Sequence, residues 1–224
     1  MKKMTACCIA LSSLSTASAD IKFALNQLVY EIRNPQTMSK DFRTCVEKIG
    51  EYLAMDVYEH LKSKEVELTT LTGGVATHSI CVEDPVLVAL LRGGLPLCLG
   101  AQKIFPYADV GFIGIARNEE TLQPKTDYVA IPDVQDRTVI IIDTMIATGG
   151  SMLDAIKTIQ KGKPRKIILL AGISAESGIE RILEYSSDVQ IFSAAIDPLL
   201  NHKGYIVPGL GDAGDRSYGF KRFR

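Results

Sequence analysis

The sequence contains no tryptophan, few histidines and almost no net charge. The three histidines, His60, His78 and His202, stand far apart, which gives little support to a zinc site. The 25 basic residues are balanced by 26 acidic ones, for a formal charge of −1, and they form no long basic stripe. We therefore expect no metal site built by the protein itself, and neither nucleic acid nor a membrane as its main partner.

Long hydrophobic runs and a disulfide framework are missing as well. No run approaches the ~20 apolar residues that are needed to span a bilayer. Cysteine is scarce and odd in number, with five residues at positions 7, 8, 45, 81 and 98, most of them among aliphatic neighbours. Such a set is typical of reduced, buried thiols in a cytoplasmic protein rather than of a disulfide-bonded scaffold.

One segment favours a different location. Residues 1–19 begin with basic residues, continue with a modestly apolar middle and end in Ala17-Ser18-Ala19, where a signal peptidase could cut. Three serines interrupt the apolar middle, however, which weakens the resemblance to a signal peptide. We therefore expect this segment to be retained and the protein to be cytoplasmic.

The rest of the chain is organised as one unit. At 224 residues and 46% hydrophobic content it can bury one sizeable core, so we expect a single domain over residues 21–224 after an unassigned extension, residues 1–20. Helical spacing marks 39–61, with Ser39 as its N-cap, and also 95–105, 151–162 and 177–185. Apolar runs typical of buried strands cover 84–94, 108–116, 139–142, 165–173 and 188–196, and 62–79 resembles short strands or a hairpin. This alternation predicts an α/β fold whose largely parallel central sheet is flanked by helices.

The stretch VIIIDTMIATGGS, residues 139–151, joins a buried strand to an acid and a turn of small residues. In α/β sheets, ligands bind beyond the carboxyl ends of the strands. The two glycines let the main chain approach a phosphate, and the start of the next helix offers free N–H groups and a positive dipole end. Thr148 and Ser151 add hydroxyl donors, and Asp143 can accept hydrogen bonds from sugar hydroxyls. The stretch predicts a sugar-phosphate or nucleotide site, although a Gly-Gly helix start also occurs in turns without a ligand.

Two arginines follow neighbouring predicted strands. Arg92 begins an Arg-Gly-Gly turn, and Arg117 stands just past the end of its strand. A single arginine in such a place is usually a solvated residue, but two beside a phosphate-binding turn would neutralise a multiply charged ligand.

Together these motifs resemble those of the type I phosphoribosyltransferases, and in particular the uracil phosphoribosyltransferases. The likeness covers roughly residues 21–220. Four segments carry it: 139–151 is similar to the phosphoribosyl diphosphate (PRPP) motif, GYIVPGLGDAGDR (204–216) to the uracil-binding segment, RNEET (117–121) to a third signature and IRNPQTMSKDFR (32–43) to an N-terminal pattern. The C-terminal segment is the most specific, because it separates uracil enzymes from purine and orotate relatives.

The resemblance implies a reaction and a set of site residues. The reaction is uracil + PRPP to UMP + diphosphate, a pentosyl transfer of pyrimidine salvage, on the type I phosphoribosyltransferase fold with a small C-terminal base-binding hood. PRPP would be bound by Arg92, Arg117, Asp143, Thr144, Met145, Ile146, Ala147, Thr148, Gly149, Gly150, Ser151 and Asp212. Uracil would be held by Ile206, Gly211, Asp212 and Ala213, and Asp212 and Arg117 are assigned to catalysis. The family also implies Mg²⁺ bound with PRPP, GTP as an activator of some members, and a homo-oligomer, either dimer or tetramer.

Three positions depart from the family pattern. Thr144 stands where proline is usual, which predicts a less rigid turn. Gly93 replaces a usual alanine, and Ala116 replaces a larger residue. We expect these changes to affect turnover and loop order rather than the type of reaction.

Other interpretations of the sequence stay open. One is a phosphoribosyltransferase for another base, and another is a non-enzymatic regulator on the same fold that binds nucleotide or RNA, which a basic face would favour. The run from Gly209 to Gly214 also satisfies the dinucleotide pattern G-x-G-x-x-G. That pattern needs a following helix and an acid ~20 residues later, whereas the chain ends ten residues on at Arg224, so NAD binding is rejected.

Overall fold

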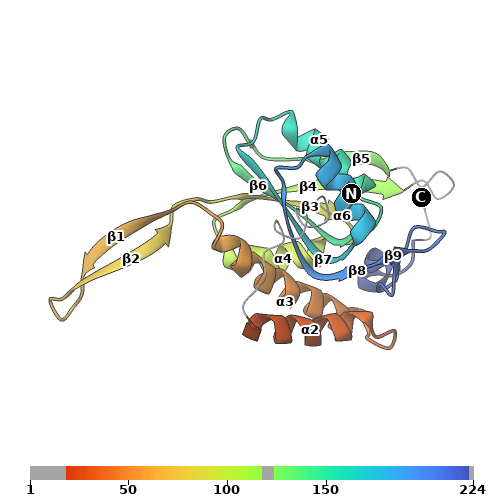
Figure 1. Cartoon of the computed structure of the whole chain (residues 1–224), viewed down its shortest axis with the longest axis horizontal. Coiled ribbons are helices and arrows are strands. Elements are labelled where there is room, and N and C mark those ends of the chain that lie inside the picture. Colours follow the sequence, from red (N-terminus) through yellow and green to blue (C-terminus); the bar gives the residue numbers. More distant parts are fainter. Residues whose placement is uncertain (1–18, 118–123, 222–224) are drawn as a thin grey trace, which may run out of the picture.

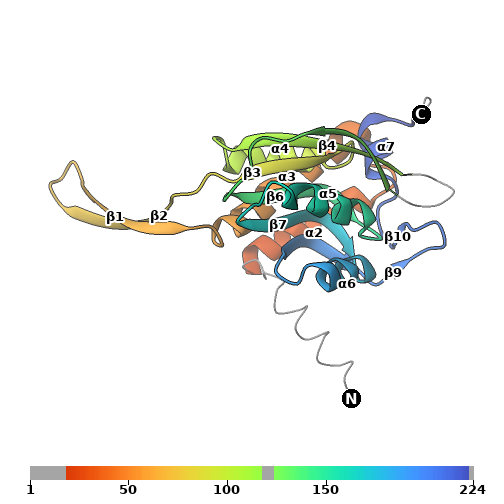
Figure 2. The same cartoon turned by 90° about the horizontal axis from the view of Figure 1, so that it is seen from above.

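The computed structural model describes residues 19–117 and 124–221. Its centre is a six-stranded sheet with helices on both faces (Figures 1 and 2). None of the helices in the described ranges is both long and apolar enough to cross a membrane.

The central sheet has the strand order β5-β4-β3-β6-β7-β8. The strands are β3 (Val86–Leu91), β4 (Asp109–Arg117), β5 (Pro124–Ala130), β6 (Thr138–Ile146), β7 (Lys166–Ala175) and β8 (Gln190–Asp197). All neighbouring pairs are parallel except β4 and β5, which are antiparallel at one edge. The predicted α/β fold with a largely parallel central sheet is therefore confirmed.

Two hydrophobic cores explain why the central strands are apolar without alternation. Helices α2 (Ala19–Arg33), α3 (Ser39–Tyr58) and α4 (Leu95–Ile104) contribute to one core, which includes Ile140 and Ile142 of β6. Helices α5 (Gly150–Gln160) and α6 (Glu176–Tyr185) contribute to the other, which includes Val139 and Ile141. Because successive side chains of a strand point to opposite faces, a strand covered on both sides must be apolar at every position.

Two smaller parts extend from this body. Strands β1 (Ser63–Thr69) and β2 (Val75–Cys81) pair with each other as an antiparallel hairpin that projects far from the sheet, as Figure 1 shows. Near the carboxyl ends of the strands, β9 (Leu199–Leu200), β10 (Ile206–Val207) and helix α7 (Ala213–Tyr218) form a small C-terminal unit. The hairpin matches the prediction for residues 62–79.

Several boundaries differ from the sequence-based expectation. Ser39 is the first helical residue of α3, and the extended residue Met38 is the N-cap, so the prediction for Ser39 was wrong. Strand β6 continues to Ile146, because Asp143, Met145 and Ile146 are still paired with β7. Helix α2 and strand β5 were not anticipated, and β5 is an edge strand whose described side chains are mostly exposed and therefore lack a clear apolar pattern.

Candidate functional site

The phosphate-binding turn predicted from the sequence is shorter than expected. Asp143 lies within β6 rather than after it, and Ile146 is buried in the core with 1% of its surface exposed, so only its main chain can face a ligand. The turn itself is Ala147 to Gly149, and Gly149 has a φ of 76°, a conformation that favours glycine. Helix α5 starts at the next residue, so its first free N–H groups open onto this turn.

Helix α6 supports the turn through residues that the sequence analysis missed. A methyl group on Gly178 would lie 2.2 Å from the carbonyl oxygen of Ala147, so only glycine allows the helix to come this close. The guanidinium of Arg181 donates a hydrogen bond of 3.0 Å to the carbonyl oxygen of Thr148. Both residues lie on a helix that looks merely amphipathic in the sequence, and neither has a motif of its own.

A second turn, residues 92–94 after β3, packs against the same strand. The peptide between Leu91 and Arg92 is cis. A methyl group on Gly94 would lie 2.4 Å from the carbonyl oxygen of Ile142, so the turn needs glycine there. The hydroxyl of Thr144 donates a 2.7 Å hydrogen bond to the carbonyl oxygen of Gly93, which ties the turn to β6.

These contacts bear on two of the departures from the family pattern. Thr144 lies in the strand and is fully buried, so the expected loosening of a turn at this position was wrong. At Gly93, a methyl group would lie 3.4 Å from an Asp143 carboxylate oxygen and 3.6 Å from the Ala213 methyl group, which are ordinary distances. Alanine would therefore fit at position 93, and the glycine is not required by space.

Position 93 also shows that three distant segments converge. Asp143 of β6 and Ala213 of the C-terminal segment both approach it closely. Asp212 caps helix α7, because its carboxylate accepts a 2.8 Å hydrogen bond from the main-chain N–H of Asp215. The predicted PRPP motif and the end of the predicted uracil segment therefore meet at the carboxyl edge of the sheet.

Arg92 is already engaged by the C-terminal helix. Its Nη2 atom is 2.7 Å from a carboxylate oxygen of Asp215, and its Nη1 donates a longer hydrogen bond of 3.4 Å to the carbonyl oxygen of Gly219. Its Nε is buried, with no hydrogen-bond partner among the described residues. Asp215 was not singled out in the sequence, although it belongs to the same C-terminal motif.

The environment of Asp143 makes it an unusual carboxyl group. Burial raises its pKa to about 7 from an ordinary 3.8, and the negative charge of Asp212 acts in the same direction. Hydrogen bonds from the main-chain N–H groups of Thr144 and Met145 oppose this rise. The electrostatic coupling places two acidic groups near each other at the site.

Arg117 is only partly described. It is the last residue of β4, which pairs in parallel with β3, so its main chain lies at the same edge of the sheet as the turn at 92–94. Asn118 and the rest of the RNEET signature lie outside the described residues. Its assignment to PRPP and to catalysis stays a prediction.

The predicted uracil residues lie along a segment with special backbone geometry. Ile206 is on β10 and is 5% exposed, and Ala213 is 1% exposed at the start of α7. Between them, the peptide before Pro208 is cis, and Gly209 and Gly211 have φ angles of 59° and 86°. The segment therefore presents main-chain groups in conformations that favour glycine.

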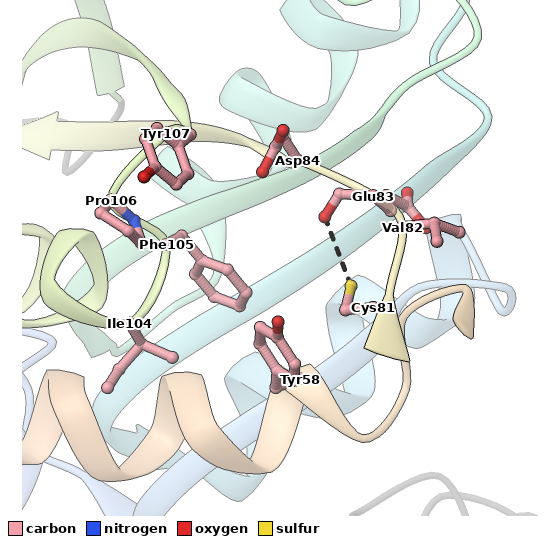
Figure 3. Close-up of a pocket in the computed structure, with 9 residues that line it drawn as sticks. All are labelled: Tyr58, Cys81, Val82, Glu83, Asp84, Ile104, Phe105, Pro106 and Tyr107. Carbon is pink, nitrogen blue, oxygen red and sulfur yellow. Dashed lines mark hydrogen bonds between the residues drawn. The ribbon is translucent and has the colours of Figure 1, made fainter. Parts of the chain in front are cut away.

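The surface has two hollows, one beside the uracil segment and one at the base of the hairpin. One, of about 450 Å³, lies beside the uracil segment. The described residues that line it are Arg33, Pro35, Pro208, Gly209, Leu210, Gly211 and Arg216. The other, also of about 450 Å³, lies at the base of the hairpin and is lined by Tyr58, Cys81, Val82, Glu83, Asp84, Ile104, Phe105, Pro106 and Tyr107 (Figure 3). This second hollow adjoins the amino end of β3, the end opposite the predicted site.

The chain is similar to known proteins over most of its length. Residues 21–220 match the family model described as uracil phosphoribosyltransferase. The uracil phosphoribosyltransferase of Bacillus velezensis is 43% identical over 197 residues, which cover 88% of this chain and 94% of that protein. That of Clostridium kluyveri is 44% identical over 191 residues, covering 85% and 91% of the two chains. Among solved structures, the AQ2163 protein from Aquifex aeolicus matches with a TM-score of 0.84 and 34% identity, covering 94% of this chain and 100% of that one.

Proposed function

This chain belongs to the uracil phosphoribosyltransferase family, and we propose that its two turns and its C-terminal segment divide the substrates of that enzyme between them. The chain is an enzyme that transfers the phosphoribosyl group of PRPP to uracil, forming UMP and diphosphate. The observation that carries the assignment of residues is the convergence at Gly93, where a methyl group would lie 3.4 Å from a carboxylate oxygen of Asp143 in the PRPP motif and 3.6 Å from the methyl group of Ala213 in the uracil segment.

PRPP would lie along the edge formed by β6 and α5. The 5′-phosphate fits the turn from Ala147 to Gly149, where the free N–H groups and the positive dipole end of α5 stabilise an anion. The hydroxyls of Thr148 and Ser151 add donors. Asp143 would accept hydrogen bonds from the ribose hydroxyls, and Thr144, Met145 and Ile146 would contribute main-chain atoms only.

The diphosphate group would lie near the turn at 92–94. Arg92 supplies a guanidinium at this place, and Arg117 ends the neighbouring strand. Because Arg92 is paired with Asp215, the diphosphate must either share this guanidinium or displace the carboxylate. Binding of the diphosphate would therefore change the contacts of helix α7, which follows directly after the uracil segment.

The chemistry requires stabilisation of a leaving group rather than a covalent nucleophile. Loss of diphosphate from the anomeric carbon passes through an oxocarbenium-like state, as glycoside cleavage does. The two arginines would stabilise the departing charge, and the uracil segment would align N1 of the base with the anomeric carbon. Asp212 would face PRPP from the start of α7.

Mg²⁺ would enter the site together with PRPP, and it would be held chiefly by the oxygens of PRPP and by water. Within the described residues, no group of three or more histidine, cysteine or acidic side chains could hold a metal ion by itself. Asp143 on β6 and Asp212 at the start of α7 nevertheless offer carboxylate oxygens at the same edge of the sheet, and oxygen ligands suit Mg²⁺. When bound, the ion would supply positive charge to the developing diphosphate.

One assay tests this function directly. Purified protein is supplied with labelled uracil and Mg-PRPP, and the product is examined for labelled UMP. UMP formation that depends on both PRPP and Mg²⁺ is expected, and adding GTP to the same assay tests activation. No UMP from folded protein with both substrates would contradict the proposed assignment of the site.

We also propose a homo-oligomer in the cytoplasm. The hairpin projects from the body and exposes Leu68, Leu71, Val75 and Ile80, and a lone two-stranded hairpin is marginal in water. A second copy packing against the hairpin would cover these side chains. Light scattering tests this by comparing the molar mass of the wild-type protein with that of a Leu71→Asp variant.

The described cysteines, 45, 81 and 98, are all free, which suits the reducing compartment proposed here, the cytoplasm.

A further inference from the structure

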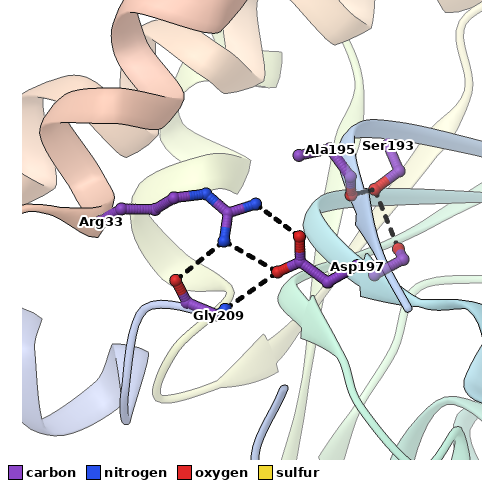
Figure 4. A network of polar contacts seen from close by, with 6 residues as sticks. Arg33, Ser193, Ala195, Asp197 and Gly209 are labelled. Carbon is purple, nitrogen blue, oxygen red and sulfur yellow. Dashed lines mark hydrogen bonds and ion pairs between the residues drawn. The ribbon is translucent and has the colours of Figure 1, made fainter. Parts of the chain in front are cut away.

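An ion pair outside the predicted site holds the uracil segment by its main chain. Arg33, at the end of α2, and Asp197, at the end of β8, form two parallel hydrogen bonds of 2.8 and 2.7 Å. Both partners also bind Gly209: Asp197 accepts from its N–H at 2.9 Å, and Arg33 donates to its carbonyl oxygen at 3.0 Å. Figure 4 shows that the four groups form a closed network.

The residue held by these bonds, Gly209, lies within the segment to which uracil binding is assigned. Gly209 follows the cis peptide before Pro208 and precedes Gly211 by two residues. Its φ of 59°, and the 2.0 Å that would separate a methyl group there from the carbonyl oxygen of Ile206, mean that this backbone conformation requires glycine. A small rotation here would move the main-chain groups at 211 and 213, which are assigned to uracil.

Apolar packing alone does not hold this turn. The hollow of about 450 Å³ borders it on one side, so Pro208 and Gly209 have open space rather than a packed neighbour there. Arg216 holds Leu210, the residue after Gly209, by donating a hydrogen bond of 3.0 Å to its carbonyl oxygen. The same guanidinium also donates to the carbonyl oxygens of Ile32 and Asn34. Its guanidinium lies 4.3 Å from the centre of the Phe42 ring. Ile206, Leu210 and Ala213 anchor the segment in the hydrophobic core, and the charged groups from α2, β8 and α7 add hydrogen bonds to the main chain of the turn between them.

We propose that Arg33 and Asp197 are positioning residues for uracil: they do not touch the base, but they set the main-chain groups that recognise it. This inference rests on the proposed function. It extends the site to the carboxyl end of α2, which lies 164 positions before Asp197 in the sequence. The role depends on geometry as well as charge, because only a planar guanidinium can bind both carboxylate oxygens and a carbonyl oxygen at once.

The test separates binding of uracil from binding of PRPP. Arg33→Lys keeps the charge and an ion pair but loses the paired hydrogen bonds, and Asp197→Asn removes the charge at nearly constant size. We expect each to raise KM for uracil about ten- to hundredfold while KM for PRPP changes less than about threefold. The ratio of kcat/KM for uracil to that for cytosine should fall as well, because a displaced segment discriminates less.

Asp109→Asn is the matched control. Asp109 forms a 2.6 Å ion pair with Arg137 at the start of β4, the opposite end of the strands from the site. It should leave both KM values and the base preference unchanged. Thermal unfolding of every variant gives Tm, so that a change in KM can be compared with any loss of stability.

The outcomes distinguish this inference from the proposed function. If wild-type protein makes no UMP, the proposed function fails before any variant is tested. If wild-type protein is active and both variants raise the two KM values equally, or lower Tm with unchanged KM for uracil, Arg33 and Asp197 have only a structural role. Should Asp197→Asn fail to fold, Arg33→Lys alone decides, since an unchanged uracil KM in that variant also overturns the inference.

Discussion

The two halves of the site are held together in different ways. The part of the PRPP half that is assigned to the ribose 5′-phosphate is one continuous stretch, in which strand β6, the turn at 147–149 and helix α5 follow one another directly. The uracil half is a short segment from Ile206 to Ala213 with little regular structure of its own, and its position depends on side chains from α2 and β8.

The difference follows from what each half must recognise. A phosphate needs a cluster of N–H donors, and the start of any well-placed helix provides them. A flat base needs donors and acceptors in a set order and direction, which a flexible segment supplies only when it is fixed from outside. The first requirement is met locally, and the second is met by tertiary contacts.

The largest expected effect concerns the choice of base. Uracil presents an acceptor, a donor and an acceptor along one edge, and cytosine differs at two of these three points. Each mismatch leaves a polar group unpaired at ~1–3 kcal/mol, which gives roughly 30-fold to 10⁴-fold discrimination against cytosine. A competition assay with both bases measures it. Cytosine used within about tenfold of uracil would contradict the view that main-chain groups of this segment read the base.

The next largest effects are expected at one glycine in each half of the site, where a substitution should disturb the binding of one substrate and not the other. Gly149→Ala and Gly209→Ala each force alanine to a positive φ, and the new methyl groups would lie 2.9 Å from the Gly178 carbonyl oxygen and 2.0 Å from the Ile206 carbonyl oxygen. We expect kcat/KM to fall about ten- to hundredfold, through KM for PRPP in the first and KM for uracil in the second.

Gly73→Ala is the control for both glycine variants. Gly73, in the hairpin turn, has a φ of 84° with nothing within 4 Å, so it shares the backbone strain without the contact. Its kinetics should be unchanged. Equal effects of Gly149→Ala and Gly209→Ala on both substrates would show that the halves are not independent.

A third prediction concerns Asp143, which links the halves electrostatically. Asp143→Asn removes a charged acceptor for the ribose hydroxyls, at roughly 1.5–3 kcal/mol, or about ten- to hundredfold in kcat/KM for PRPP. Steady-state kinetics on the folded variant measure the change. Wild-type values would rule out a ribose role for this carboxylate.

The same variant should change how stability depends on pH. The folded protein keeps the Asp143 proton up to a pKa of about 7, whereas the unfolded chain loses it near 3.8. Between these values the folded state binds more protons, so this group's contribution to stability falls as pH rises. Asparagine does not titrate, so the variant should lose less stability than wild type on going from about pH 5 to about pH 8, by roughly 2–3 kcal/mol. Urea unfolding at both pH values tests this, and parallel curves would contradict the raised pKa.

The smallest expected effect comes from the hydrogen bond between strand β6 and the turn at 92–94. Thr144→Val keeps the shape of a buried side chain but removes the hydroxyl that bonds the Gly93 carbonyl oxygen. A neutral hydrogen bond of this kind contributes about 0.5–1.5 kcal/mol, so KM for PRPP should rise about two- to tenfold with little change for uracil. Kinetics with each substrate varied in turn measure the difference, and an equal rise in both KM values would show that the bond serves the whole site.

Much of the PRPP half of the site could be predicted from the sequence. The unbroken run of β-branched residues in β6 indicated a strand covered on both faces, and the glycines after it indicated a tight turn at a helix start. The end of the strand was misplaced at residue 142, because pairing with β7 carries it to Ile146, and such pairing is invisible in a local pattern. Gly178 was missed for the same reason, since its need for close approach depends on which helix packs on the turn.

By itself, the sequence determined the order of the central strands and helices apart from α2 and β5, and it determined the glycine-dependent turn, because periodicity and turn chemistry act between near neighbours. The base-binding segment was identified through its resemblance to a family motif. Only the tertiary structure decided that Arg33 and Asp197, 164 positions apart, meet at Gly209, and that Arg92 pairs with Asp215. Charged partners at such separations carry no spacing signal, since their contact exists only after the sheet has brought α2, β8 and the C-terminal segment to one edge.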